Sequence, residues 1–143
     1  QKTKKLLTKD YFVSCMQAIE HLNHIWTGSH TGSLIVRNFD GSIAFTVSDS
    51  HTSRITSILL VDNKHVWTSS SDGWIIVWDI AGKRKGSITT TENHDTIKCL
   101  FEVVLPDGSS QIWSSTPRGK KISCWNRDTF ELIHSFELNQ QVH

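Results

Sequence analysis

The sequence is poor in proline, cysteine and tyrosine and lacks any long apolar run. Its 143 residues include two Pro, three Cys and one Tyr. Apolar runs such as 75–78 stop far short of the roughly 18 residues that a membrane-spanning helix needs. The basic residues within 2–5 precede no apolar stretch of the kind found in secretion signals. These absences lead us to expect a cytoplasmic protein.

The three cysteines are too few and too scattered for a disulfide framework. Cys15, Cys99 and Cys124 are odd in number, and no two of them form the Cys-x-x-Cys pair that is typical of structural zinc sites. We therefore expect reduced, buried thiols, and we expect neither a bound metal nor a cofactor.

Charge of one sign is not in excess either. Fifteen Lys and Arg stand against fourteen Asp and Glu, which leaves a formal net charge of +1. Binding to nucleic acid or to a membrane surface usually depends on a strong positive field, so the composition disfavours both. What the chain does contain is apolar bulk. Hydrophobic residues make up 37% of it, with six Trp and six Phe, which is enough for the packed core of one domain.

An internal repeat organises the whole sequence. The segments 25–29, 66–70 and 112–115 each carry Trp as their second residue, and Trp26, Trp67 and Trp113 lie 41 and 46 positions apart. A period near 40 residues is typical of repeat folds such as propellers. An apolar segment follows each Trp segment, at 34–37, 75–78 and 122–125, and another precedes each, at 13–16, 55–58 and 97–100.

Each repeat closes with a more polar, alternating segment, at 42–47, 86–90 and 130–138. Gly and Asp residues separate the segments, as hairpin turns require, and no stretch has a sustained helical period. We predict an all-β fold of about three four-stranded antiparallel sheets with essentially no helix. Along the chain, we predict an outer strand of a preceding sheet at 1–8, then sheets at 9–50, 51–90 and 91–138, then a connection at 139–143.

The middle repeat carries a recognisable motif. Residues 69–79 read Ser-Ser-Ser-Asp-Gly-Trp-Ile-Ile-Val-Trp-Asp, which resembles the signature of a WD-repeat β-propeller blade. His51 resembles the histidine that introduces the innermost strand in that family. The aromatic doublets of the three repeats resemble those of divergent blades in multidomain signalling proteins. The resemblance implies three propeller blades that belong to a larger ring of six to eight.

The resemblance also implies a structural hydrogen-bond network. In the family, four residues of a blade are linked, and they map here to His51, Thr68, Asp72 and Trp78. The third repeat keeps a partial set, which is His94, Ser114 and Trp125. The first repeat has Thr31 and Arg37 where the Asp and the strand Trp belong, so we expect no full network there.

Catalysis is disfavoured by the absence of supporting motifs. The chain has no Gly-x-Ser-x-Gly elbow of a serine hydrolase and no phosphate-binding Gly-x-x-x-x-Gly-Lys-Ser/Thr loop. The chain has eight histidines. His21 and His24 are three residues apart, but they fall in a turn and not in a helix, so we do not expect their side chains to meet in a metal or catalytic site. We expect no enzyme.

The function that the resemblance implies is a non-catalytic scaffold, because loops on a rigid support are where binding residues usually lie. Two alternatives remain open. The chain could be the regulatory or targeting segment of a multidomain signalling enzyme, such as a GTPase regulator, a kinase or an inositol phosphatase. It could also bind phosphate, a lipid headgroup or nucleic acid through the basic turn that contains Arg118, Lys120 and Lys121.

The expected partners are proteins or peptides, together with whatever completes the ring. Three blades form an arc with two apolar faces, so we expect either further blades of the same parent chain or self-association. The family's usual binding face maps to seven residues of this chain: Tyr11, Phe12, His30, Arg54, Ser71, Thr96 and Arg118.

Overall fold

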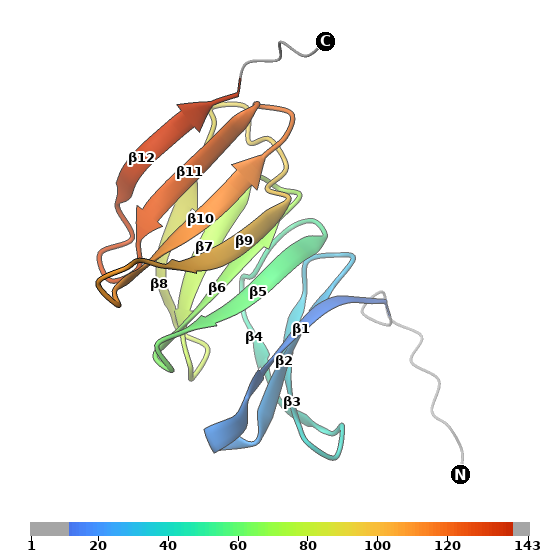
Figure 1. Cartoon of the computed structure of the whole chain (residues 1–143). Helices are drawn as coiled ribbons and strands as arrows, with labels where there is room; N and C mark the ends of the chain where they lie inside the picture. Colours follow the sequence, from blue (N-terminus) through green and yellow to red (C-terminus); the bar gives the residue numbers. More distant parts are fainter. Residues whose placement is uncertain (1–11, 139–143) are drawn as a thin grey trace.

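The structure, a computed structural model, describes residues 12–138, which form three four-stranded antiparallel sheets, here called blades (Figure 1). The first blade contains β1 (Val13–Ile19), β2 (His24–Ser29), β3 (Leu34–Asn38) and β4 (Ile43–Val47). The second contains β5 (Ile55–Val61), β6 (His65–Ser70), β7 (Trp74–Asp79) and β8 (Arg84–Thr89). The third contains β9 (Cys99–Val104), β10 (Ser110–Thr116), β11 (Lys121–Asn126) and β12 (Leu132–Glu137). The predicted three all-β sheets are confirmed, whereas the segments predicted at 1–8 and 139–143 lie outside the described residues.

The second blade is packed on both faces, and its third strand has the continuous apolar sequence that such packing requires. Side chains alternate between the two faces of a strand, so a strand buried on both sides reads as a continuous apolar run. In β7, Ile76 and Trp78 join the core shared with the first blade, whereas Ile75 and Val77 join the core shared with the third. This explains why 75–78 is the most hydrophobic segment of the repeat.

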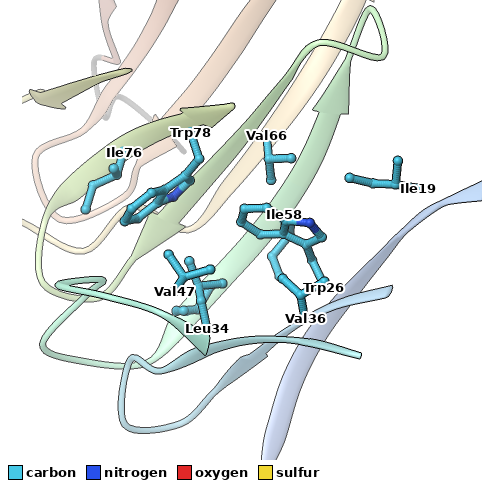
Figure 2. Packing of buried hydrophobic residues seen from close by; sticks show 10 residues of the cluster. Ile19, Trp26, Leu34, Val36, Val47, Ile58, Val66, Ile76 and Trp78 are labelled. Atoms are coloured by element: carbon cyan, nitrogen blue, oxygen red, sulfur yellow. The ribbon is translucent and has the colours of Figure 1, made fainter. Parts of the chain in front are cut away.

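The core between the first two blades is built from large, fully covered side chains (Figure 2). Trp26 and Val36 of the first blade pack in one cluster with Ile58, Val66 and Trp78 of the second. Burying one large apolar side chain stabilises a fold by about 1.5–3 kcal/mol. The contact between the blades therefore contributes substantially to stability.

The innermost strands β1, β5 and β9 lie next to one another and join the blades (Figure 1). The Ser14 hydroxyl donates to the carbonyl oxygen of Ile55 at 2.6 Å, and the Thr56 hydroxyl donates to that of Ile97, also at 2.6 Å. Ser14 and Thr56 occupy the same place in consecutive repeats. The repeat therefore specifies the contact between blades as well as the blade itself.

Two details differ from the sequence-based prediction. The innermost strand of the third blade begins at Cys99 and not at Ile97, because the Ile97 amide donates to Ser70 of the second blade at 3.1 Å instead of pairing with β10. A short 3-10 helix, Glu20–Leu22, precedes β2. Within residues 12–138, no helix is long and apolar enough to cross a membrane.

Candidate functional site

The polar centre of the second blade is a chain of hydrogen bonds between its strands. His51 precedes β5, Thr68 lies in β6, Asp72 lies in the turn that follows, and Trp78 lies in β7. The His51 Nδ1 atom is 3.1 Å from Asp72 Oδ2, and its Nε2 atom is 2.7 Å from the Thr68 hydroxyl. The Trp78 indole N–H donates to the same hydroxyl at 3.0 Å. The structure thus brings together the four residues that the resemblance singled out.

The direction of each bond follows from what each group can donate. An ionised Asp72 can only accept, so the hydrogen lies on Nδ1 of His51, and in the neutral ring Nε2 accepts from Thr68. The carboxylate also accepts the backbone amides of Thr52 and Trp74, each at 2.9 Å. Every polar group of the network is then satisfied, which is what burial requires.

The Asp72 carboxyl is held in its ionised form. Burial by itself raises the pKa of a carboxyl group, but the hydrogen bond from His51, the bond from the Thr52 amide, the electrostatic contribution of His51 and the bond from the Trp74 amide outweigh it. The pKa of Asp72 falls to about 2 as a result. A carboxyl group with such a pKa is ionised near neutral pH, so it accepts hydrogen bonds and carries no proton to donate.

Thr68, His51 and Asp72 are linked in the same order as a nucleophile, a base and an orienting acid. The arrangement does not provide a reachable nucleophile, because the Thr68 residue is 0% exposed and its hydroxyl also receives the Trp78 indole N–H. A substrate carbonyl would have to approach that oxygen through the sheet. The geometry therefore supports a structural network.

The third blade contains only part of this network, and the prediction for His94 is wrong. The Trp125 indole N–H donates to the Ser114 hydroxyl at 3.0 Å. His94 is exposed, has a left-handed backbone with φ of 53°, and stacks on Trp74 with ring centroids 5.3 Å apart. The left-handed backbone directs the ring away from Ser114, and its Nδ1 atom instead lies 3.3 Å from the Thr89 hydroxyl.

The first blade has a different arrangement at the same positions. The hydroxyl of Thr27, which corresponds to Thr68, donates to the carbonyl oxygen of Ile35 at 2.7 Å. Thr31 is exposed and lies 3.1 Å from the Ser29 hydroxyl. Arg37 occupies the register position of Trp78 and donates from its guanidinium to Gly41.

The candidate partner-binding residues gather at one end of the blades. The turns β2–β3, β6–β7 and β10–β11 and the connections β4–β5 and β8–β9 all lie at this end, here called the turn face (Figure 1). The ring of Phe12 lies edge-on to His30 at 6.0 Å. The Ser71 amide donates to the backbone carbonyl oxygen of Arg54 at 2.9 Å, and the Thr96 hydroxyl donates to the backbone carbonyl oxygen of Ser71 at 3.4 Å.

The predicted partner-binding residues that the structure describes differ in exposure. His30, Arg54 and Arg118 are exposed, and Phe12 is 61% exposed. Ser71 and Thr96 are half-buried and take part in the contact between the second and third blades. Tyr11 lies outside the described residues. The side chains accessible to a partner are therefore the cationic and aromatic ones.

A cleft at the rim of the second blade was not predicted from the sequence. It has a volume of about 200 Å³ and is lined by Ser50, Thr52, Asp72, Trp74, Ile76, Arg84 and Ser87. The Arg84 guanidinium lies over the Trp78 ring, 5.5 Å from its centroid. In the sequence, only Arg84 could have indicated this cleft, and an arginine in an outer strand is usually just exposed to solvent. Within residues 12–138, no group of three or more His, Cys, Asp or Glu side chains is placed to hold a metal ion.

Known proteins resemble this chain in sequence. No protein-family model matches it. It is 31% identical over 118 residues to the WD repeat and FYVE domain-containing protein 2 of Caenorhabditis briggsae, a match that covers 80% of this chain and 27% of the relative. It is 28% identical over 116 residues to the protein of the same name from Caenorhabditis elegans, again over 79% of this chain and 27% of the relative. The chain thus spans 27% of the length of these relatives.

Solved structures resemble it in fold. The WD40 repeats of RRP9 superpose with a TM-score of 0.75 at 15% identity, over 90% of this chain and 39% of that one. The WD40 β-propeller domain of Doa1 gives a TM-score of 0.71 at 20% identity, over 88% of this chain and 40% of that one. At these identities, the likeness concerns the fold, and it matches the three blades to part of a propeller.

Proposed function

We propose that this chain, which belongs to the WD-repeat family and forms three blades of a β-propeller, works as a non-catalytic scaffold that binds other proteins through its turn face. The observation that carries the proposal is the difference between the interior and the turn face. The hydrogen-bond network of the second blade is buried and saturated, whereas His30, Arg54 and Arg118 are exposed on turns that a rigid set of sheets supports.

Rigid support matters because binding to a preformed surface avoids the entropy loss of ordering loops. The backbone of the turn face is fixed by bonds between segments, such as His30 N to Phe12 O at 3.0 Å and Ser71 N to Arg54 O at 2.9 Å. Arg and aromatic side chains are the residue types that most often anchor a protein interface. The turn face offers both.

The test compares two sets of three substitutions in affinity capture from cell extract. One set carries His30→Ala, Arg54→Ala and Arg118→Ala on the turn face. The other carries Lys64→Ala, Lys83→Ala and Glu131→Ala, exposed positions in turns at the opposite end. We expect the first set alone to reduce recovery of the captured proteins, with denaturation midpoints unchanged in both. Equal recovery from both sets would contradict the proposal.

A second candidate function is a targeting segment within a multidomain protein. The two worm relatives are named as proteins that contain both WD repeats and a FYVE domain. Their names support an arrangement in which a propeller lies beside another module, and the fraction of their length matched leaves room for one. A link to a signalling enzyme in particular, and a cytoplasmic location, remain predictions.

The third blade carries an exposed apolar patch on one face. Trp113 occupies the register position of Trp26 and Trp67, which are 0% exposed. It lies on a sheet face that no other segment of residues 12–138 covers, beside Phe101 and Phe136, which are 61% and 39% exposed. Apolar patches of this kind usually mark interaction surfaces. We propose that further blades or a second copy cover this face, and that the turn face remains available for other proteins.

A further inference from the structure

The turn between β10 and β11 departs from the repeat at one position. In the first two blades, Gly32 and Gly73 close this turn with φ of 98° and 86°, each donating its amide to the carbonyl three residues earlier. In the third blade, Lys120 makes the same bond, to Pro117 at 3.0 Å, with φ of 53°. Left-handed backbone is unfavourable for a residue with a long side chain. The third blade therefore maintains strain at a place where glycine is the relaxed choice.

The lysine side chain also changes what can pack on the turn. A Cβ atom added to Gly32 would lie 2.3 Å from the carbonyl oxygen of His51, and one added to Gly73 would lie 2.4 Å from that of His94. At both turns, the segment that leads into the next blade passes directly over the glycine. At the matching position of the third blade, the Cβ atom of Lys120 takes up this space, so no segment can pass as closely over that turn.

The turn is cationic, and its charged side chains form no ion pair with the described residues. Arg118 and Lys120 are exposed, and so is Lys98, which is one position beyond the Cys99–Ser115 pair at the same end of the blade. None of these three side chains has a carboxylate within ion-pair distance among residues 12–138, whereas Arg127 at the opposite end has three. The corresponding turns of the first and second blades carry no Lys or Arg.

We propose that Lys98, Arg118 and Lys120 form a docking edge for an acidic peptide segment of a protein partner. The inference rests on the proposed scaffold function and names the chemistry of the partner. Strained residues that persist are often found at functional sites, and here the left-handed residue is an exposed cation. Guanidinium and ammonium groups bind carboxylates by charge-assisted hydrogen bonds.

The surroundings favour a short acidic peptide over a polyanion. Glu92 is exposed in the β8–β9 connection, and Asp95 Oδ2 would lie 3.2 Å from a Cβ atom on Gly119. The Asp95 carboxylate therefore borders the turn itself, so a nucleic acid or a charged bilayer that extended across the edge would meet negative charge there. A peptide with a few carboxylates contacts the cations alone. The chain's net charge of +1 also provides no general attraction for polyanions.

The experiment measures binding of a short fluorescein-labelled peptide of alternating Asp and Gly to the full chain by fluorescence anisotropy. The comparison peptide has Asn in place of every Asp. The test variant carries Lys98→Gln, Arg118→Gln and Lys120→Gln. The control variant carries Lys64→Gln, Lys83→Gln and Lys85→Gln, which are also exposed and give the same change in net charge. Single-stranded RNA and vesicles of phosphatidylcholine with phosphatidylserine serve as alternative ligands.

We expect the test variant to weaken binding of the Asp peptide about tenfold or more, the sum of three exposed ion pairs, and the control variant to leave it within about twofold. The Asn peptide should not bind, and added salt should weaken binding of the Asp peptide. Lys120→Gly should raise the denaturation midpoint because it relieves the backbone strain. It should nevertheless weaken binding of the Asp peptide because it removes one of the three cations. Equal loss in both variants, or tighter binding of RNA or vesicles through the same residues, would overturn the proposal.

The outcome is separable from that of the scaffold function. If the test variant still captures the same proteins from extract, and only the peptide assay fails, the docking edge is wrong and the scaffold stands. If turn-face substitutions leave capture unchanged while the peptide still binds the cations, the scaffold proposal fails and the edge stands.

Discussion

Phe130 of the third blade lies edge-on to Trp67 of the second, with ring centroids 5.6 Å apart and the ring planes at 87°. In the first blade, Trp26 has the same kind of cover from Phe45 in its own fourth strand, at 6.5 Å and 89°. The second blade has Gly86 at the register position of Phe45. The ring of Phe130 fills the space that Gly86 leaves. Each buried Trp is therefore covered by one Phe ring, which comes from the same blade for Trp26 and from the next blade for Trp67.

This exchange predicts a compensating pair of substitutions. Phe130→Gly should destabilise the fold by about 2 kcal/mol, less than a fully buried Phe, because the ring is half-buried and its left-handed φ of 65° is relieved. Gly86→Phe alone should also destabilise, since a Cβ atom there would lie 3.1 Å from the Phe130 ring. Urea denaturation should show that the double variant recovers part of the loss. A double variant that is less stable than either single one would contradict the exchange.

Asp72→Ala should reduce the free energy of unfolding by about 1–3 kcal/mol, because it leaves three hydrogen-bond donors, one of them buried, without an acceptor. Those donors are the His51 ring and the amides of Thr52 and Trp74. Thr31→Ala, at the matching place in the first blade, should have a much smaller effect because Thr31 is exposed. Denaturant midpoints measure both. Equal shifts would show that the network is not confined to the second blade.

Acid should destabilise the fold through the same carboxyl group. The pKa of Asp72 is about 2 in the fold and near 3.9 in an unfolded chain. A depressed pKa contributes stability above the unfolded value, and this contribution is lost as the pH falls between about 4 and 2. Asp72→Asn should therefore be less stable at neutral pH and should lose less stability over that window. An unchanged acid dependence, measured by thermal melts at stepped pH, would argue against an ionised Asp72.

The cysteines should react slowly with thiol reagents. Burial raises the pKa of the Cys15 thiol, against smaller lowering effects of the Ser14 hydroxyl and the charge of Arg54. Burial also raises the pKa of Cys124, which is 3% exposed. Since the thiolate is the reactive form, labelling of both at neutral pH should be much slower than in denaturant. Labelling at the denatured rate would contradict the placement of β1 and β11.

The repeat and its alternation were enough to predict the three sheets, because strand pairing here is local and joined by short hairpins. Residues 25–29 and 34–37 show this, since two strands and one turn determine each other's register. The network of the second blade was also predictable. Its four members lie at fixed spacings within one motif, and buried polar groups that must satisfy one another tolerate few substitutions.

The remaining features depend on contacts that sequence spacing does not encode. His94 precedes Ile97 by three residues, whereas His51 precedes Ile55 by four, and a left-handed backbone then turns its ring onto Trp74. The cover of Trp67 by Phe130 crosses between blades and depends on a glycine more than 40 residues earlier. Such choices are made by packing, after the strands are in place.

Hydrogen–deuterium exchange with and without a captured protein tests the scaffold proposal most directly. Exchange reports which backbone amides become protected when a partner binds. We predict slower exchange in the turns 30–33, 71–73 and 117–120 of the turn face, with little change in β9 and β12. Protection confined to the strands of the third blade, around Phe101, Trp113 and Phe136, would contradict the account, because the captured protein would then only be completing the propeller.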